Sequence, residues 1–229
     1  MTKPLCAVVG VGPGNGAAFA RAFDRHGYRL ALLARSTDFG SQLAGSLSEA
    51  RAYACDVGDP AAVERAFRDV GEPEVVIYNA GSGVFTGFEN TSVADYEASW
   101  RVNALGAFAV AKQVVPAMKR AGRGSLVVIG ATASTRGGPM TSAFASAKAA
   151  QRTFAEALAR EFWPAGVHVA LLAIDGVVDL PRTRARLADK PDDFFVKPDD
   201  VAAAAVALAT QPRSTWTFEQ FVRPFGERW

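Results

Sequence analysis

The chain contains little cysteine and little histidine, which argues against disulfides, metal sites and histidine-based catalysis. Its 229 residues include two cysteines, Cys6 and Cys55, and two histidines, His26 and His168. Both cysteines lie in apolar runs without metal-ligand spacing, so neither a disulfide framework nor a zinc site is indicated. Two isolated histidines also give no support for a metal centre or histidine-based catalysis. We therefore expect a protein without bound metal, in a reducing compartment.

Charge imbalance and long apolar runs are absent as well. The 25 Lys and Arg residues nearly balance the 23 Asp and Glu residues, and the basic residues form no cluster suited to nucleic acid. No run reaches the roughly 18 apolar residues of a membrane span. The N-terminal segment is weakly basic and its apolar stretch is short, unlike a signal peptide. We expect a cytoplasmic protein with no nucleic-acid or membrane partner.

Short apolar segments rich in Val, Leu and Ile alternate with longer helical stretches. This alternation is typical of a parallel sheet covered by helices on both faces. The sequence therefore predicts an α/β fold with a doubly wound parallel sheet. The predicted strands are residues 5–9, 29–34, 51–55, 74–79, 125–130, 168–174 and 218–223.

One domain accounts for the whole chain, residues 1–229. Its length suits a single core, and no repeat or low-complexity linker divides it. Residues 180–200 are polar, contain several prolines and follow the sixth predicted strand. Segments at the carboxyl ends of strands form the ligand crevice in such folds, so residues 180–200 are a candidate substrate lid.

A glycine-rich turn follows the first predicted strand and begins the first predicted helix. It contains Gly10, Gly12, Gly14, Asn15 and Gly16. Glycine permits a tight turn and lets the backbone approach a pyrophosphate at a helix N-terminus. Its position after the first strand predicts a dinucleotide-binding turn and disfavours a merely structural one.

The residues after the second and third predicted strands indicate which dinucleotide binds. An acid that would hold the ribose 2′-hydroxyl of NAD is missing, and Ala34 is followed by Arg35. A guanidinium suits the 2′-phosphate of NADP in charge and geometry, although Arg35 could also be a solvated surface residue. Asp56 and Val57 are placed to contact the adenine. The sequence predicts NADP(H) in preference to NAD(H).

Further motifs follow the glycine-rich turn and Asp56, at residues 79–81, at residues 102–106 and at Lys148. In this combination and order, the whole chain resembles the short-chain dehydrogenase/reductases. The resemblance implies a nucleotide-binding Rossmann fold. It also implies that Asn79, Ala80 and Gly81 contact the cofactor. Lys148 would hold the nicotinamide ribose. Gly176 and Val178 would form the turn beside the nicotinamide, and Tyr78 is the tyrosine expected nearest the cofactor.

The chain retains two of the family's four catalytic residues, which are an Asn, a Ser, a Tyr and a Lys. Asn103 and Lys148 match, whereas Ala131 and Phe144 stand at the serine and tyrosine positions. In the family, tyrosine protonates the substrate oxygen and serine donates a hydrogen bond to it. The chain therefore resembles an atypical member with impaired ketone reduction. Phe144 would form an apolar wall beside the nicotinamide, or would be a core aromatic residue.

Other polar groups near these positions could supply the missing proton. Asp175 and Asp179 lie where the family has a Pro-Gly turn, and burial could raise the pKa of such a carboxyl. The alternative is that they cap a turn or face water. The hydroxyls of Thr132, Ser134 and Ser142 are close in sequence, but a hydroxyl is a poor acid at neutral pH without assistance.

Two functions remain open at this point. The first is an NADP-dependent oxidoreductase that transfers a hydride between the nicotinamide and a small carbonyl or activated C=C substrate, with altered proton transfer. The second is a catalytically inactive dinucleotide-binding sensor or partner subunit. The resemblance also implies a homodimer or homotetramer built on helices around residues 102–119 and 142–162.

Overall fold

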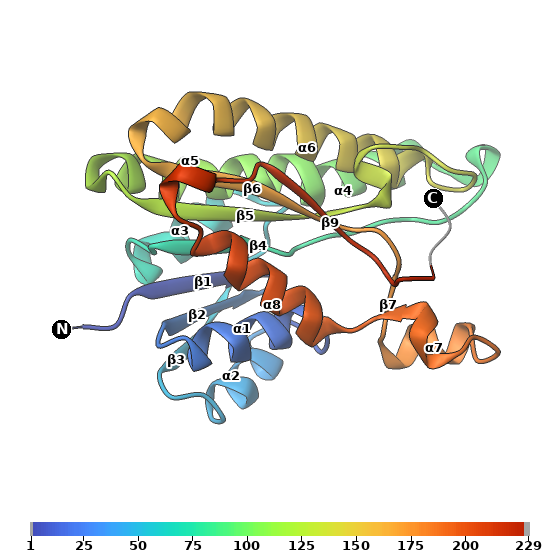
Figure 1. The fold of residues 1–229 in the computed structure, drawn as a ribbon. Coiled ribbons are helices and arrows are strands. Elements are labelled where there is room, and N and C mark those ends of the chain that lie inside the picture. Colours follow the sequence, from blue (N-terminus) through green and yellow to red (C-terminus); the bar gives the residue numbers. More distant parts are fainter. Residues whose placement is uncertain (1, 227–229) are drawn as a thin grey trace.

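Seven short apolar segments form one parallel sheet in the computed structural model, which describes residues 2–226 (Figure 1). The strand order is β3-β2-β1-β4-β5-β6-β9. The strands are β1 Leu5–Val9, β2 Arg29–Ala34, β3 Ala50–Ala54, β4 Val75–Tyr78, β5 Gly124–Ala131, β6 Val167–Ile174 and β9 Glu219–Val222. Each begins and ends within one residue of its predicted range, so the predicted doubly wound fold is confirmed.

Helices cover both faces of the sheet (Figure 1). One face packs on α1 Asn15–Arg25, α2 Asp38–Ala44 and α8 Pro198–Ala209. The other face packs on α3 Pro60–Val70, α5 Gly106–Ala121 and α6 Ser142–Phe162. Helix α4, Val93–Trp100, contacts α6 and continues through a π-helical segment, Arg101–Leu105, into α5. All eight residues of β6 are buried, because this strand is covered from both sides.

The candidate lid is a folded segment rather than an irregular loop. Two-residue strands, β7 Val177–Val178 and β8 Phe195–Val196, pair with each other and enclose the short helix α7, Pro181–Arg186. Asp179 accepts hydrogen bonds from Arg184 at 2.7 Å and from Lys197 at 2.7 Å, which ties the beginning of the segment to its end. This packing places α7 at the carboxyl edge of the sheet (Figure 1).

The strand order reverses between β1 and β4, which are parallel neighbours in the sheet. Crossovers from β1 lead to β2 and β3 on one side, whereas β4 is followed by β5 and β6 on the other. Ligands bind at the carboxyl ends of the strands at such a switch point. Gly10 follows β1 with φ 94°, and a Cβ built on it would lie 2.5 Å from the backbone nitrogen of Ala80. Only glycine permits this approach.

We predict that Gly10→Ala lowers the free energy of unfolding by about 1–3 kcal/mol, because it adds backbone strain and a clash with Ala80. Gly12→Ala is the matched control in the same turn, where an added Cβ has no atom within 4 Å. It should change stability by less than about 0.5 kcal/mol. Urea denaturation compares the two variants, and equal stabilities would contradict the close approach.

Candidate active site

A cleft of about 1210 Å³ opens at the carboxyl ends of the central strands, between the glycine-rich turn and the candidate lid. It brings together nearly all of the predicted site residues. Those that line it are Gly10, Gly12, Asn15, Gly16, Arg35, Asp56, Val57, Asn79, Ala80, Gly81, Ala131, Phe144, Lys148, Gly176 and Val178. Gly14 and Asn103 do not line the cleft. Gly14 lies against the side chain of Leu180 from the lid, and Asn103 is fully buried behind the cleft wall.

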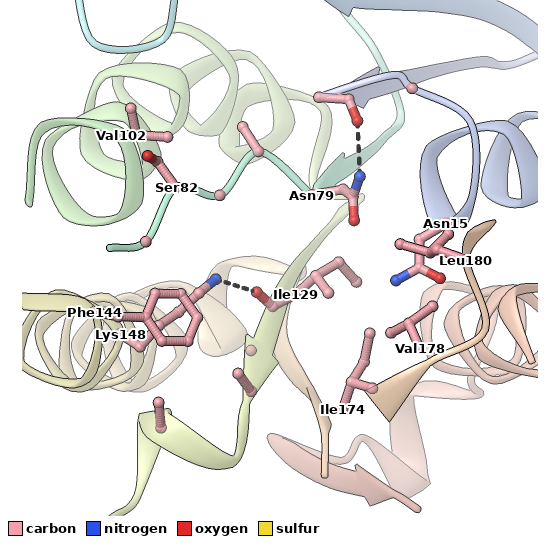
Figure 2. Close-up of a pocket in the computed structure, with 18 of the residues that line it drawn as sticks. Asn15, Asn79, Ser82, Val102, Ile129, Phe144, Lys148, Ile174, Val178 and Leu180 are labelled. Carbon is pink, nitrogen blue, oxygen red and sulfur yellow. Dashed lines mark hydrogen bonds between the residues drawn. The ribbon is translucent and has the colours of Figure 1, made fainter. Parts of the chain in front are cut away.

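The glycine-rich turn forms one wall of the cleft. The Asn79 side chain donates to the Gly10 carbonyl at 2.7 Å, which fixes the turn against the end of β4 (Figure 2). A Cβ on Gly16 would lie 2.8 Å from the same carbonyl. The Oδ1 atom of Asn15 is buried and has no hydrogen-bond partner among residues 2–226. Close backbone packing at the start of a helix is what a phosphate-binding turn provides, because the N-terminal N–H groups of the helix can donate to a phosphate.

The distal end of the cleft carries Arg35 and Asp56. Arg35 is exposed after β2 and makes no ion pair or hydrogen bond with another described residue. The Asp56 carboxylate accepts from the Gly58 backbone nitrogen at 2.9 Å, which orients it beside the buried Val57. A guanidinium with unused donors at this position can bind an additional phosphate.

Lys148 occupies the opposite end of the cleft and is 6% exposed. Its Nζ atom donates to the Ile129 carbonyl at 2.9 Å (Figure 2). It also donates to Gln151 Oε1 at 3.0 Å. Both acceptors are neutral. Burial without a carboxylate partner lowers the pKa of Lys148 to about 8. The ammonium retains one donor beyond these two hydrogen bonds.

Gln151 connects Lys148 to Asn103. Its amide nitrogen donates to the Asn103 carbonyl at 2.8 Å, while its oxygen accepts from Lys148. The Asn103 side chain in turn donates to the carbonyls of Ser82 at 2.6 Å and Ser99 at 2.8 Å. The sequence analysis missed Gln151. Its signal was a polar residue one turn after Lys148, on the buried face of α6.

Phe144 lies on α6 one turn before Lys148 and faces the cleft (Figure 2). Its ring centroid is 5.1 Å from that of Phe85 and 5.9 Å from Lys148 Nζ. A Cβ on Gly83 would lie 2.6 Å from the Phe144 ring, so the loop after β4 fits closely over it. Neither Phe144 nor Ala131, at the end of β5, brings a hydroxyl to this part of the cleft.

Four of the five polar groups considered as substitute acids make hydrogen bonds or ion pairs within the protein, and the fifth, Ser142, is exposed and does not line the cleft. The Thr132 hydroxyl donates to Asp175 at 2.6 Å, and the Ser134 hydroxyl accepts from the Ala131 backbone nitrogen at 3.1 Å. Asp175 is 3% exposed and does not line the cleft. Hydrogen bonds from Arg184 and Lys197 hold the pKa of Asp179 well below its ordinary range, so Asp179 remains an anion at neutral pH.

Tyr78 is also not placed as expected. It is fully buried beneath the cleft, and its hydroxyl donates to the Val102 carbonyl at 2.5 Å. Burial raises the pKa of Tyr78, which keeps this hydroxyl protonated. Tyr78 therefore does not line the cleft, because the last residue of β4 points into the core between the sheet and α5.

This arrangement is that of a dinucleotide-binding α/β protein, and comparison with known proteins identifies its family. The short chain dehydrogenase family matches residues 5–190. D-threitol dehydrogenase of Mycolicibacterium smegmatis is 30% identical over 222 residues, covering 90% of this chain and 85% of the relative. The chain therefore belongs to the short-chain dehydrogenase family, with the Rossmann fold.

Solved structures agree with this assignment. An alcohol dehydrogenase from Thermococcus sibiricus complexed with 5-hydroxy-NADP has a TM-score of 0.88 and 29% identity, and covers 99% of this chain and 98% of that chain. A metagenomic short-chain oxidoreductase in complex with NADP has a TM-score of 0.82 and 26% identity, and covers 98% of both chains. Within residues 2–226, no helix has the length and apolarity to cross a membrane, and no cluster of metal-ligating side chains is found.

The low pKa of Lys148 predicts how stability changes with pH. The folded protein loses this proton near pH 8 and the unfolded chain near pH 10.5, so the cost of burying the ammonium disappears as pH rises through that window. Relative to Lys148→Met, the unsubstituted protein should gain on the order of 1–3 kcal/mol of unfolding free energy between pH 7 and pH 10.

Urea denaturation at several pH values measures this difference. Lys112→Met, on the exposed face of α5, is the control, and its pH dependence should parallel that of the unsubstituted protein. If Lys148→Met also runs parallel, Lys148 has an ordinary pKa in the folded protein.

Proposed function

We propose that the protein is an NADP-dependent oxidoreductase acting on a small carbonyl or activated C=C substrate, with proton transfer different from that of its family. The observation that carries this proposal is the continuous cleft from Arg35 through the glycine-rich turn to Lys148. The NADP-bound relatives of the same fold support the choice of cofactor. When bound, the reduced nicotinamide would supply hydride.

The residues present fit this cofactor. The turn at Gly10 and Gly16 leaves room for the pyrophosphate, and the N-terminal N–H groups of α1 could donate to it. Arg35 would bind the 2′-phosphate and Asp56 the adenine amino group. The remaining donor of Lys148 would hold the nicotinamide ribose, while Gly176 and Val178 would line the nicotinamide side.

Proton transfer must differ if Ala131 and Phe144 occupy the serine and tyrosine positions. A positioned general acid typically contributes about 10²–10⁴-fold, and an oxyanion donor about 10²–10³-fold. Without either, reduction of an ordinary ketone would be slow. An activated C=C bond is a better substrate, because water can protonate carbon after hydride addition.

The second candidate is a dinucleotide-binding sensor or partner subunit without turnover. The hydrogen bonds of Thr132 and Ser134 favour it, because the cleft retains its cofactor-binding residues while the Thr132 hydroxyl donates to Asp175 and the Ser134 hydroxyl bonds to the Ala131 backbone. Failure to oxidise NADPH with any carbonyl or enone in a broad panel, despite tight NADPH binding, would favour this second function.

We also propose that the protein is a cytoplasmic homodimer or homotetramer. Helices α4 and α5 expose Tyr96, Trp100 and Phe108, at 45%, 41% and 48% respectively. Phe108 packs against Phe154 of α6 with ring centroids 5.7 Å apart. This apolar surface supports association through the helices around residues 102–119 and 142–162.

Cofactor preference is the first test of the proposal. NADPH should bind more tightly than NADH by about 1.5–3 kcal/mol, the range of a hydrogen bond to a charged group. Arg35→Asp should reverse the preference, because the carboxylate pairs with a free 2′-hydroxyl and repels a phosphate. Fluorescence titration measures both affinities. Equal or tighter NADH binding by the unsubstituted protein would contradict the role of Arg35.

The missing hydroxyls give the second test. Phe144→Tyr combined with Ala131→Ser should raise NADPH-dependent reduction of activated ketones by about 10²-fold or more, because the tyrosine hydroxyl would lie near Lys148 and regain a proton-donating role. Ala131→Ser alone should have little effect, since an oxyanion donor without an acid leaves the alkoxide unneutralised. Loss of NADPH absorbance is measured in both single variants and the double variant. A folded double variant that binds NADPH but remains inactive would show that the pocket is built for another substrate.

A further inference from the structure

Asp175 has a role that the family resemblance does not explain. This carboxylate stands just after β6 and is 3% exposed. Its Oδ1 atom accepts from Thr132 at 2.6 Å and lies 3.4 Å from the Arg136 guanidinium. Its Oδ2 atom lies 3.2 Å from Arg223. A buried carboxylate therefore anchors the loop between β5 and α6 through Thr132 and Arg136.

The Arg136 guanidinium contacts Asp175 on one side and is accessible from the cleft on the other. Its side chain is 53% exposed and lines the cleft, although its guanidinium contacts a carboxylate that is itself buried. The contact to Asp175 uses one nitrogen, which leaves the other donors available. Arginine presents these donors in a planar arrangement that matches a carboxylate.

The charges around Arg136 favour an anion. The basic residues lining the cleft, within residues 2–226, are Arg35, Arg136, Lys148, Arg182 and Arg186. Asp56 is the one acid in that lining, and it lies at the distal end with Arg35. Arg182 and Arg186 of the lid have no partner within the described part of the chain. Asp175 contacts Arg136 from outside this lining, and the lining at the substrate end itself carries basic residues and no acid.

An apolar surface lies in the same part of the cleft. Phe85 and Phe144 pack together at 5.1 Å, and Phe85 is 55% exposed. The loop that carries Arg136 packs on the beginning of α6, where an added Cβ on Gly137 would lie 4.0 Å from the Ala145 Cβ. The cleft thus offers two packed aromatic rings and a positioned guanidinium in one lining.

We propose that Arg136, positioned by Asp175, binds the carboxylate of a substrate whose planar apolar body lies against Phe85 and Phe144. This inference rests on the proposed function and adds the substrate class: a small carboxylic acid whose reducible group is next to or conjugated with the carboxylate. The proposal also gives a role to Asp175 after β6, which orients Arg136 and does not donate a proton.

The test uses benzoate and benzamide, which have nearly the same shape and differ in charge. Their affinities are measured by isothermal titration calorimetry with and without saturating NADP⁺. The unsubstituted protein should bind benzoate about 10-fold more tightly than benzamide, as expected for a charge-assisted hydrogen bond at a partly exposed site. Arg136→Gln should abolish this preference, and Arg21→Gln, which removes an exposed arginine of α1 outside the cleft, should retain it.

Asp175→Asn tests the positioning role. The variant keeps Arg136 and a hydrogen-bonding side chain at residue 175, so a fall in the preference for benzoate with unchanged benzamide affinity identifies lost orientation of the guanidinium. If this buried substitution prevents folding, Thr132→Val tests the same anchor more mildly, and it too should reduce the preference. An unchanged preference in a folded anchor variant would overturn the positioning by Asp175.

Other outcomes separate this inference from the proposed function. A protein that binds NADPH but does not prefer benzoate overturns the substrate class alone. Loss of the preference in Arg182→Gln but not in Arg136→Gln assigns the carboxylate to α7 and overturns the role of Arg136. Weaker NADPH binding by Arg136→Gln with unchanged benzoate preference would show that Arg136 binds cofactor phosphates. Preference for benzoate without NADPH binding contradicts the proposed function and supports the carboxylate site.

Discussion

The close approach of Gly10 to Ala80 is the constraint on which the cleft depends. At this point the chain turns away from β1 toward one side of the sheet and away from β4 toward the other, which opens a space at their carboxyl ends. Side chains would fill that space or push the strands apart. Glycine keeps the turn against the neighbouring backbone, and the Asn79 side chain fixes it there by a hydrogen bond to Gly10.

The buried Lys148 ammonium is the second organising feature, because its charge requires acceptors from several elements. Ile129 supplies one from β5 and Gln151 another from α6. Gln151 then satisfies the carbonyl of Asn103 in the π-helical segment between α4 and α5. One polar network thus joins the sheet to two helices behind the cleft. Burial lowers the pKa of this ammonium, and its neutral acceptors supply no counterion to offset that effect.

Most of the polar groups that could replace the missing proton donor have partners within the protein. Thr132 and Asp175 bond to each other, and Asp179 is paired with Arg184 and Lys197. Their ion pairs and hydrogen bonds stabilise the lid and the loop before α6, so they shape the walls of the cleft. If the substrate has a C=C bond conjugated with its carboxylate, the charge that develops on hydride addition is shared by that carboxylate, where a bound arginine would stabilise it.

The sequence by itself determined the strands, the glycine-rich turn and most cleft residues, because local patterns and the order of motifs encode them. The sequence does not indicate which way the side chains of Tyr78 and Asp175 point, or which groups they contact through hydrogen bonds and ion pairs. It also gave little reason to choose Gln151 or Arg136, since each acts through a partner distant in the chain: Asn103 for Gln151 and Asp175 for Arg136. Such pairings form only when the sheet brings β5, β6 and α6 together. The tertiary structure alone therefore determined which polar groups face the cleft and which form the hydrogen bonds and ion pairs that stabilise its walls.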